Sequence, residues 1–246
     1  MTNHPFTRFG IDHLSCSSLN LWRASPGIWG LRYLGNIKDE GNAAMWRGNA
    51  VENGFSHILR GTNLAEASKL AVQAFDLNSQ GELSDEIQTE RDLISPMLKQ
   101  CSEWQPPATL AATQLRVEHW LEDVPIPLIG FLDFAFEEID VDLKTTKACP
   151  SKPRPDHVRQ VSFYRAARQK QGGILYVTDK RKAYYQIDDA AMDRALNDLQ
   201  TDAICLMNFL ARCDTKQDVF KSLPIDYDSF LAPKTKIPFE QLLMAG

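Results

Sequence analysis

Acidic residues and a lysine recur at alternate positions of the segment 138–144. If this segment is a half-buried β-strand, its period of two places Asp140, Asp142 and Lys144 on one face and apolar residues on the other. A further acid, Asp133, lies at the end of the preceding apolar segment. Carboxylates in such an arrangement hold a hard divalent cation, while an ammonium group reaches a phosphate group or the water that attacks it. The spacing therefore indicates a metal-dependent phosphodiesterase.

Four separated segments form an ordered set around these charges. They are Ser15-Cys-Ser-Ser-Leu-Asn-Leu-Trp22 with Pro26 after it, Arg47-Gly-Asn-Ala-Val-Glu52, Gly130-Phe-Leu-Asp133 with Asp142-Leu-Lys144, and Gln160-Val-Ser-Phe-Tyr164. The set resembles the PD-(D/E)XK nuclease superfamily, in its RecB-like and phage lambda-type exonuclease branch, over roughly residues 15–178. A D-x-K motif alone often arises by chance, so the order of the four segments makes the resemblance specific.

The resemblance implies an α/β fold, a restriction-endonuclease-like core with a mixed central sheet flanked by helices. Hydrophobic periodicity indicates a matching order of elements. It predicts two short helices within 15–36, helices over 43–60, 64–78, 82–104, 156–170 and 189–212, and strands over 109–120, 126–134, 138–144, 174–177 and 183–187. We expect Pro96 to kink or divide the helix over 82–104, and Gly172-Gly173 to end the helix over 156–170.

We expect residues 1–246 to form a single nuclease domain with three sections. A mainly helical section covers 1–108, the catalytic sheet core covers 109–188, and a C-terminal helix and tail cover 189–246.

The resemblance also implies a metal site built from three acids. Glu52, Asp133 and Asp142 would ligate one or two Mg²⁺ or Mn²⁺ ions, with the backbone carbonyl of Leu143 as a further oxygen ligand. Glu52 falls near the edge of the apolar stripe of its predicted helix, where a partly desolvated carboxylate needs a partner. An exposed helix glutamate is the alternative interpretation of Glu52.

Three residues complete the predicted catalytic group. Lys144 would orient and help to activate the attacking water, or neutralise charge that develops on the phosphate. Gln160 would fix that water, the lysine or a DNA phosphate, and Tyr164 would support it from one helical turn away. Asp140 shares the charged strand face with Asp142, and we expect it to lie behind the metal ligands or in solvent.

The charge distribution favours DNA binding at one part of the chain. The net charge is −5, but the stretch from Lys144 to Lys170 has eight basic residues and one acid, Asp156, so it carries +7. Phosphate-contacting cations are expected there, although a solvated helix face is the alternative. The predicted DNA-binding residues are Ser17, Asn20, Arg23, Arg47, Lys147, Arg154, Arg159 and Tyr164.

Composition limits the class of protein. The 246 residues are 43% hydrophobic, enough for a sizeable core. No apolar run approaches the roughly 18 residues that span a membrane, and the start lacks the apolar core of a signal peptide. We therefore expect a protein of the bacterial or phage-infected host cytoplasm. Its cysteines are odd in number and far apart, which favours free thiols and no iron–sulfur cluster: Cys16, Cys101, Cys149, Cys205 and Cys213.

The sequence thus predicts a metal-dependent DNA exonuclease that resects DNA ends in phage or bacterial recombination or repair. By resemblance, its partners would be DNA and a single-strand annealing protein, and it would form a homo-oligomeric ring of three. Three alternatives stay open at this point: a catalytically inactive DNA-binding module, an endonuclease of the same superfamily, and an unrelated acid-rich hydrolase with an accidental D-x-K.

Overall fold

The chain forms two compact units in the computed structural model. The structure describes residues 4–37, 41–82, 84–106, 108–229 and 231–232. The unit that we call the sheet unit comprises residues 41–116 and 131–192, and the helical unit comprises residues 1–40, 117–130 and 193–246. The predicted single domain with sections over 1–108, 109–188 and 189–246 stays a prediction.

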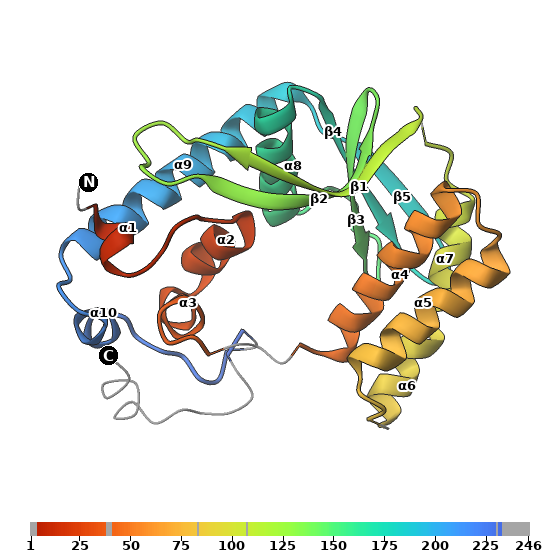
Figure 1. The fold of residues 1–246 in the computed structure, drawn as a ribbon, viewed down its shortest axis with the longest axis horizontal. Helices are drawn as coiled ribbons and strands as arrows, with labels where there is room; N and C mark the ends of the chain where they lie inside the picture. The colour runs from red at the N-terminus through yellow and green to blue at the C-terminus, as the bar shows by residue number, and fades with distance from the viewer. Residues whose placement is uncertain (1–3, 38–40, 83, 107, 230, 233–246) are drawn as a thin grey trace. The chain divides into compact units, whose positions relative to one another are not determined.

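A five-stranded mixed sheet is the centre of the sheet unit (Figure 1). Its strands follow one another in chain order: β1 (Leu110–His119), β2 (Leu128–Phe136), β3 (Ile139–Thr145), β4 (Gln171–Val177) and β5 (Lys182–Gln186). β2 and β5 run antiparallel to their neighbours β3 and β4, whereas β3 and β4 are parallel to each other. A parallel pair needs a long crossover connection, and helix α8 (Pro155–Arg168) provides it. The predicted α/β class with a mixed, helix-flanked sheet is confirmed.

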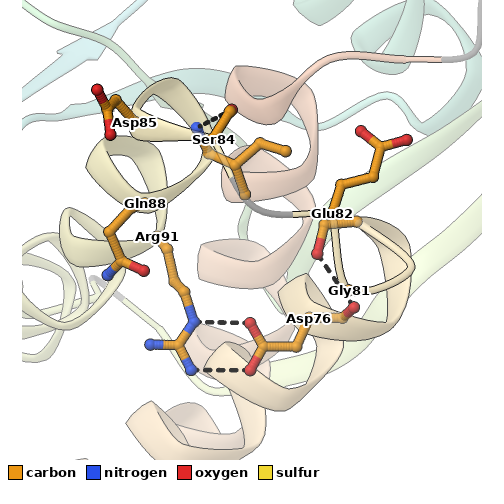
Figure 2. Close-up of a pocket in the computed structure, with 9 residues that line it drawn as sticks. Asp76, Gly81, Glu82, Ser84, Asp85, Gln88 and Arg91 are labelled. Carbon is orange, nitrogen blue, oxygen red and sulfur yellow. Dashed lines mark hydrogen bonds and ion pairs between the residues drawn. The ribbon is translucent and has the colours of Figure 1, made fainter.

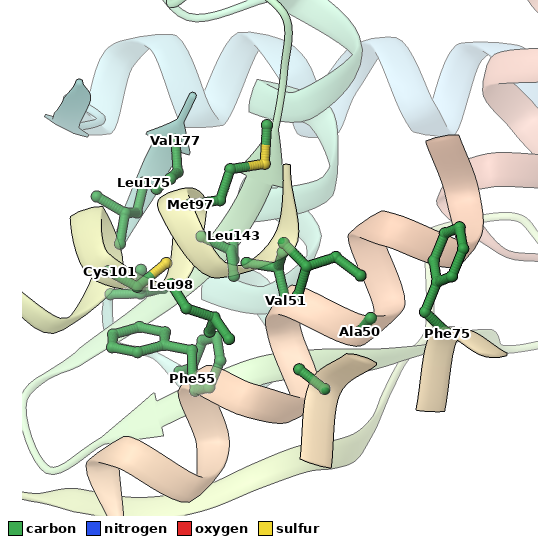
Figure 3. Packing of buried hydrophobic residues seen from close by; sticks show 14 of the residues in the cluster. Ala50, Val51, Phe55, Phe75, Met97, Leu98, Cys101, Leu143, Leu175 and Val177 are labelled. Carbon is green, nitrogen blue, oxygen red and sulfur yellow. The ribbon is translucent and has the colours of Figure 1, made fainter. Parts of the chain in front are cut away.

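Four helices lie on one side of this sheet: α4 (Ala43–Leu59), α5 (Leu64–Asn78), α6 (Asp85–Asp92) and α7 (Ile94–Ser102). α4 and α7 pack on the strands, and α5 and α6 pack on these two helices. The core between them includes Val51 and Phe55 of α4, Leu98 of α7, and Leu143 of β3 (Figure 3). At Gly54 the helices approach so closely that an added Cβ would lie 2.7 Å from Leu98. This packing fixes α4, and with it Glu52, against the sheet.

The predicted division of the helix over 82–104 is confirmed. The break falls at Leu93, between α6 and α7, so that Pro96 is the third residue of α7. Proline is tolerated in the first turn of a helix because its missing N–H has no intrahelical acceptor there.

The expectation that Gly172-Gly173 ends the helix before them is wrong. α8 ends at Gln169, which has φ of 57° in the left-handed region and donates its N–H to Arg165 O. The two glycines instead belong to β4. A Cβ at Gly172 would overlap Val161 of α8, and a Cβ at Gly173 would overlap Tyr184 of β5, so both serve close packing.

The strand β3 is buried on both faces, which corrects the expectation of a half-buried strand. Ile139 and Val141 pack under α4 and α7, while Asp140 is 1% exposed and Asp142 is fully buried on the opposite face. The position of β3 between β2 and β4, with helices on both sides, accounts for the burial.

The helical unit contains α1 (Pro5–Arg8), α2 (Cys16–Ala24), α3 (Pro26–Tyr33), α10 (Lys216–Ser222) and most of α9 (Asp189–Ala211). The two short helices predicted within 15–36 and the long helix over 189–212 are confirmed. Ser15 caps α2, and Ser18 accepts a hydrogen bond from Trp29 Nε1 at 3.0 Å. Among the described residues, no helix is long and apolar enough to cross a membrane.

Candidate active site

Asp142 and Lys144 form an ion pair on the central strand β3. Asp142 is fully buried, and Lys144 Nζ lies 2.8 Å from its Oδ2. Burial raises the pKa of Asp142 despite the attraction of Lys144. Burial alone would lower the pKa of Lys144, but the charges of three nearby carboxylates outweigh it and raise that pKa. The positive charge of Lys144 thus depends on the carboxylates around it.

Asp133 of β2 accepts a hydrogen bond from the backbone of β3 beside this pair. The register pairs of β2 with β3 are Phe134 with Val141 and Ala135 with Asp140. Next to them, the N–H of Leu143 donates to Asp133 Oδ2 at 2.9 Å. The N–H and C=O of one strand residue point to the same side, so the carbonyl of Leu143 also faces β2. Burial, followed by the charges of Asp142 and Glu52, holds the pKa of Asp133 well above its usual range.

Glu52 of α4 completes the group of acids, and Gln114 of β1 contacts it. Gln114 Nε2 donates to Glu52 Oε1 and lies 3.5 Å from Asp133 Oδ1. Glu52 is half-buried, as its place in the apolar stripe predicts. Burial raises its pKa, while the hydrogen bond from Gln114 opposes that shift.

Gln114 is a site residue that the sequence analysis missed. It has φ of 50° inside a strand, a left-handed conformation that costs a residue with a side chain about 1–2 kcal/mol. Glutamine has no particular preference for this conformation, so nothing in the local sequence marks it. The contact with Glu52 identifies it, because backbone strain of this kind concentrates at functional sites.

A chain of hydrogen bonds connects Lys144 with α8. Lys144 Nζ donates to Gln160 Oε1 at 3.1 Å, and Gln160 Nε2 donates to the Tyr164 hydroxyl at 2.7 Å. That hydroxyl donates to the backbone oxygen of Phe131 at 2.6 Å. Gln160 and Tyr164 thus share one face of α8, as their spacing of four predicts. We expected Gln160 to contact the attacking water, the lysine or a DNA phosphate, and in the structure it contacts the lysine.

The donor set of this site suits a hard divalent cation in kind. Three carboxylates and the carbonyl of Leu143 are oxygen ligands, and Asp142 Oδ1 is buried without a hydrogen-bond partner. Yet in the part of the chain that the structure describes, no three His, Cys, Asp or Glu residues form a ready-made metal-binding group. Lys144 and Gln114 contact the acids in this arrangement, so binding a cation would require these side chains to shift.

The structure therefore brings together the five predicted catalytic residues, Glu52, Asp133, Asp142, Lys144 and Gln160, in the sheet unit. Their roles in catalysis and metal binding stay predictions. Asp140 is not in solvent: Arg168 Nε lies 2.9 Å from its Oδ2, and this buried pair connects α8 with β3.

Three of the predicted DNA-binding residues are buried. Arg47 pairs with Glu90 of α6 and lies 3.4 Å from Thr145 O at the end of β3, so it ties α4 to two other elements. Arg159 is 3% exposed, and Tyr164 is 2% exposed. In this structure these side chains contact protein groups, and their contact with DNA stays a prediction.

The basic stretch from Lys144 to Lys170 is partly neutralised by ion pairs. Arg154 pairs with the adjacent Asp156 at 2.8 Å, and Arg165 lies 3.3 Å from Asp189. Lys147, by contrast, has a side chain that is 82% exposed, with Glu90 at 3.7 Å. Lys147 and Arg154 thus remain the accessible members of the predicted DNA-binding set in this stretch.

The other predicted DNA contacts lie in the helical unit. Ser17 is exposed on α2, and Asn20 is half-buried. Arg23 donates to both carboxylate oxygens of Asp202 on α9, at 2.8 and 3.0 Å. That bidentate pair stabilises the packing of α2 on α9, and DNA binding by the three residues stays a prediction.

A cavity of about 540 Å³ lies at the turn between α5 and α6 (Figure 2), and Glu52, Asp133 and Asp142 are not part of its lining. Arg91 crosses it and forms a bidentate pair with Asp76, with distances of 2.6 and 2.8 Å. Because Arg91 already pairs with Asp76, we interpret this cavity as the surroundings of a structural ion pair and not as a binding site.

Comparison with known proteins places these observations in a family. A model of the PD-(D/E)XK nuclease superfamily matches residues 13–230. No curated protein matches the chain. Among solved structures, the crystal structure of SSO0001 is 23% identical, covers 39% of this chain and 50% of its own, and has a TM-score of 0.31. This chain thus spans half the length of that protein. Because the TM-score is low, we conclude nothing about fold or function from this match. The family model, however, spans most of the chain and includes the acids and the lysine that β2, β3 and α4 bring together, so the protein belongs to the PD-(D/E)XK nuclease superfamily.

Proposed function

We propose that this nuclease is a metal-dependent DNA exonuclease of the RecB-like and lambda-type branch, which resects DNA ends in phage or bacterial recombination or repair. The supporting observation is the hydrogen bond between Lys144 and Gln160. It joins the D-x-K motif on β3 to the Gln-xxx-Tyr motif on α8, the two segments whose combination carries the resemblance to that branch. A single-strand annealing partner, a ring of three and a cytoplasmic location stay predictions from the sequence.

Nucleases of this superfamily typically use a divalent metal. We assign its binding to Glu52, Asp133, Asp142 and the carbonyl of Leu143, as Mg²⁺ or Mn²⁺ in one or two ions. When bound, such a cation polarises the scissile phosphate and lowers the pKa of a water molecule.

The protein's own groups supply charge and orientation. During hydrolysis the water oxygen bonds to phosphorus while the bond from phosphorus to the leaving oxygen breaks, and negative charge builds on the phosphate. We assign the electrostatic stabilisation of this charge to the ammonium group of Lys144, which pairs with Asp142. Gln160 holds the ammonium group in one orientation. Tyr164 accepts a hydrogen bond from Gln160 and is itself fixed by its hydrogen bond to Phe131 O.

Replacing Lys144 with methionine tests this assignment. We expect Lys144→Met to reduce the cleavage rate at least about 100-fold, because it removes a charge aimed at the transition state. DNA affinity should stay within a few-fold, since one phosphate contact among many is lost. Rates of linear DNA degradation with Mg²⁺ and with EDTA, together with binding in Ca²⁺, measure both effects.

A folding measurement and a control variant make this experiment specific. Lys144→Met leaves Asp142 buried without its ion-pair partner, so urea unfolding of this variant beside the wild type separates misfolding from lost chemistry. Lys180→Met removes an equal charge from an exposed turn and should cleave normally. Wild-type rates in Lys144→Met would reject the assignment.

Linear DNA and covalently closed circular DNA together separate the remaining candidate functions. An exonuclease degrades linear DNA and spares covalently closed circles, whereas an endonuclease cuts both. A binding module holds linear DNA in Mg²⁺ without cutting it, and an unrelated hydrolase neither binds nor cuts it.

A further inference from the structure

A polar cavity of about 450 Å³ lies between α4 and β1, and Glu52 is part of its lining. Its wall on α4 also includes Asn49, Asn53 and Arg60, and its wall on β1 includes Thr113 and Gln114. Asn49, Asn53 and Arg60 follow one another at helical spacing, so they share one helix face. Neither asparagine amide has a side-chain hydrogen-bond partner among the described residues, so both are available to a ligand.

Arg60 gives this cavity a positive charge that forms no ion pair with a described carboxylate, although Glu52 lines the same cavity. Its Nη1 donates to Ser56 Oγ, and its Nη2 donates to Thr113 Oγ1. Both partners are neutral hydroxyl groups, and no described carboxylate forms an ion pair with Arg60. The two hydroxyls hold the guanidinium plane in place and leave several of its five N–H donors for an anion.

The position of Arg60 relative to Glu52 follows from helix geometry. Their backbones are eight residues apart, but the guanidinium of Arg60 reaches back to Ser56, one helical turn, or about 6 Å along the axis, from Glu52. At a rise of 3.4 Å per nucleotide of a duplex strand, this is about two nucleotide steps. An anion at Arg60 would thus lie close to Glu52, in the same cavity.

We propose that this cavity binds a backbone phosphate of the DNA strand, a few nucleotides from the phosphate that is cut. Arg60 supplies the charge, and the amides of Asn49 and Asn53 supply further hydrogen bonds. The proposal rests on the proposed function, and it adds a contact that holds the strand in register beside the acids.

A scan of single neutral phosphates tests the proposal. Each phosphate of a short linear duplex is replaced in turn with methylphosphonate, and the dissociation constant is measured in Ca²⁺. For the wild-type protein we expect one position, a few nucleotides from the cut, to weaken binding about 5- to 10-fold. In Arg60→Gln the unmodified DNA should bind more weakly by a similar factor, and the penalty at that position should disappear.

The salt dependence of binding gives a second measurement. Arg60→Gln should reduce the slope of log K against log salt by about 0.7–0.9, while Arg60→Lys should preserve the slope because it keeps the charge. Lys180→Gln is the matched control, since it loses one charge from an exposed turn. Its methylphosphonate profile should match that of the wild type.

The possible failures are distinguishable. If Arg60→Gln binds and unfolds like the wild type and keeps the same profile, Arg60 only caps the end of α4 and the proposal is overturned. If the wild-type protein does not bind DNA at all, the proposed function fails and this site fails with it. If the penalty at the one methylphosphonate position disappeared in both Arg60→Gln and Lys180→Gln, the effect would be one of general charge, and the proposal would also be overturned.

Discussion

Three acids with raised pKa values share the site, and Lys144 and Gln114 offset the repulsion between them. Lys144 contributes a full charge, whereas Gln114 contributes an amide dipole at the cost of a left-handed backbone. Two different groups thus offset the repulsion between the acids. Each can be tested separately, because only Gln114 carries backbone strain.

At Gln114 we expect glycine to be better tolerated than alanine. Both Gln114→Gly and Gln114→Ala lose the hydrogen bond to Glu52, but only glycine adopts φ of 50° without steric cost. The glycine variant should therefore be more stable than the alanine variant by about 1 kcal/mol, measured by urea unfolding in EDTA. Arg116 on the same strand lacks a positive φ, so there alanine should be the more stable of the two. Equal stability of the Gln114 pair would remove the argument for strain.

At the scale of elements, α8 positions the site by packing against β3 and β4. Gln160 reaches Lys144, and Arg168 reaches Asp140, so both contacts depend on the distance between α8 and the sheet. Gly172 sets this distance, since a Cβ there would overlap Val161.

Gly172→Ala should therefore destabilise the protein by roughly 1–3 kcal/mol through overpacking. Val161→Ala removes the clashing methyl groups, so the same glycine substitution should cost much less in that background. A double-mutant cycle in urea measures the coupling. Additive effects of the two substitutions would mean that Val161 does not limit the approach of α8.

His157 predicts a loss of stability in mild acid. Its Nδ1 lies 2.8 Å from the Tyr176 hydroxyl, and burial, then the charge of Lys144, lowers its pKa to about 4, with Asp156 opposing the shift. The unfolded chain binds a proton below about pH 6.5, whereas the folded protein does not until about pH 4. Stability is therefore present above pH 6.5 and is lost as pH falls through this window, by about 2 kcal/mol between pH 7 and pH 5.

His157→Asn should remove this part of the pH dependence while retaining a polar group near Tyr176. Urea unfolding of both proteins at pH 7 and pH 5 measures the difference. Parallel losses of stability would assign the acid sensitivity to other groups.

At the scale of the whole molecule, the predicted metal ligands all belong to the sheet unit. A ligand that binds only the folded state stabilises it by about 2.7 kcal/mol at 100 times its dissociation constant. Mg²⁺ should therefore slow amide hydrogen exchange in β2, β3 and α4 more than in α1 and α2 of the helical unit.

Asp142→Asn is the control for this localisation, since it removes a proposed ligand and should abolish the Mg²⁺ effect. An equal change in both units, or a Mg²⁺ effect that survives in Asp142→Asn, would argue against a cation at these acids.

Local features of the fold and the site could be predicted from the sequence. Alternation of charged and apolar residues placed Asp142 and Lys144 on one strand face, and the spacing of four placed Gln160 and Tyr164 on one helix face. Both follow from the geometry of a single strand or helix, so they can be read from a few neighbouring residues. The order of the four motif segments added the family, which the match over residues 13–230 confirms.

Contacts between residues that are distant in sequence could not be predicted and become visible in the folded structure. Arg47 and Glu90 are far apart in sequence, as are Glu52 and Gln114, and no local period pairs them. From the sequence, Gly172 suggests the end of a helix, whereas in the structure it allows close packing against Val161. The burial of Asp140 likewise depends on α8 covering β3 and supplying Arg168. These features result from packing between elements, and a pattern within one element contains no information about its neighbours.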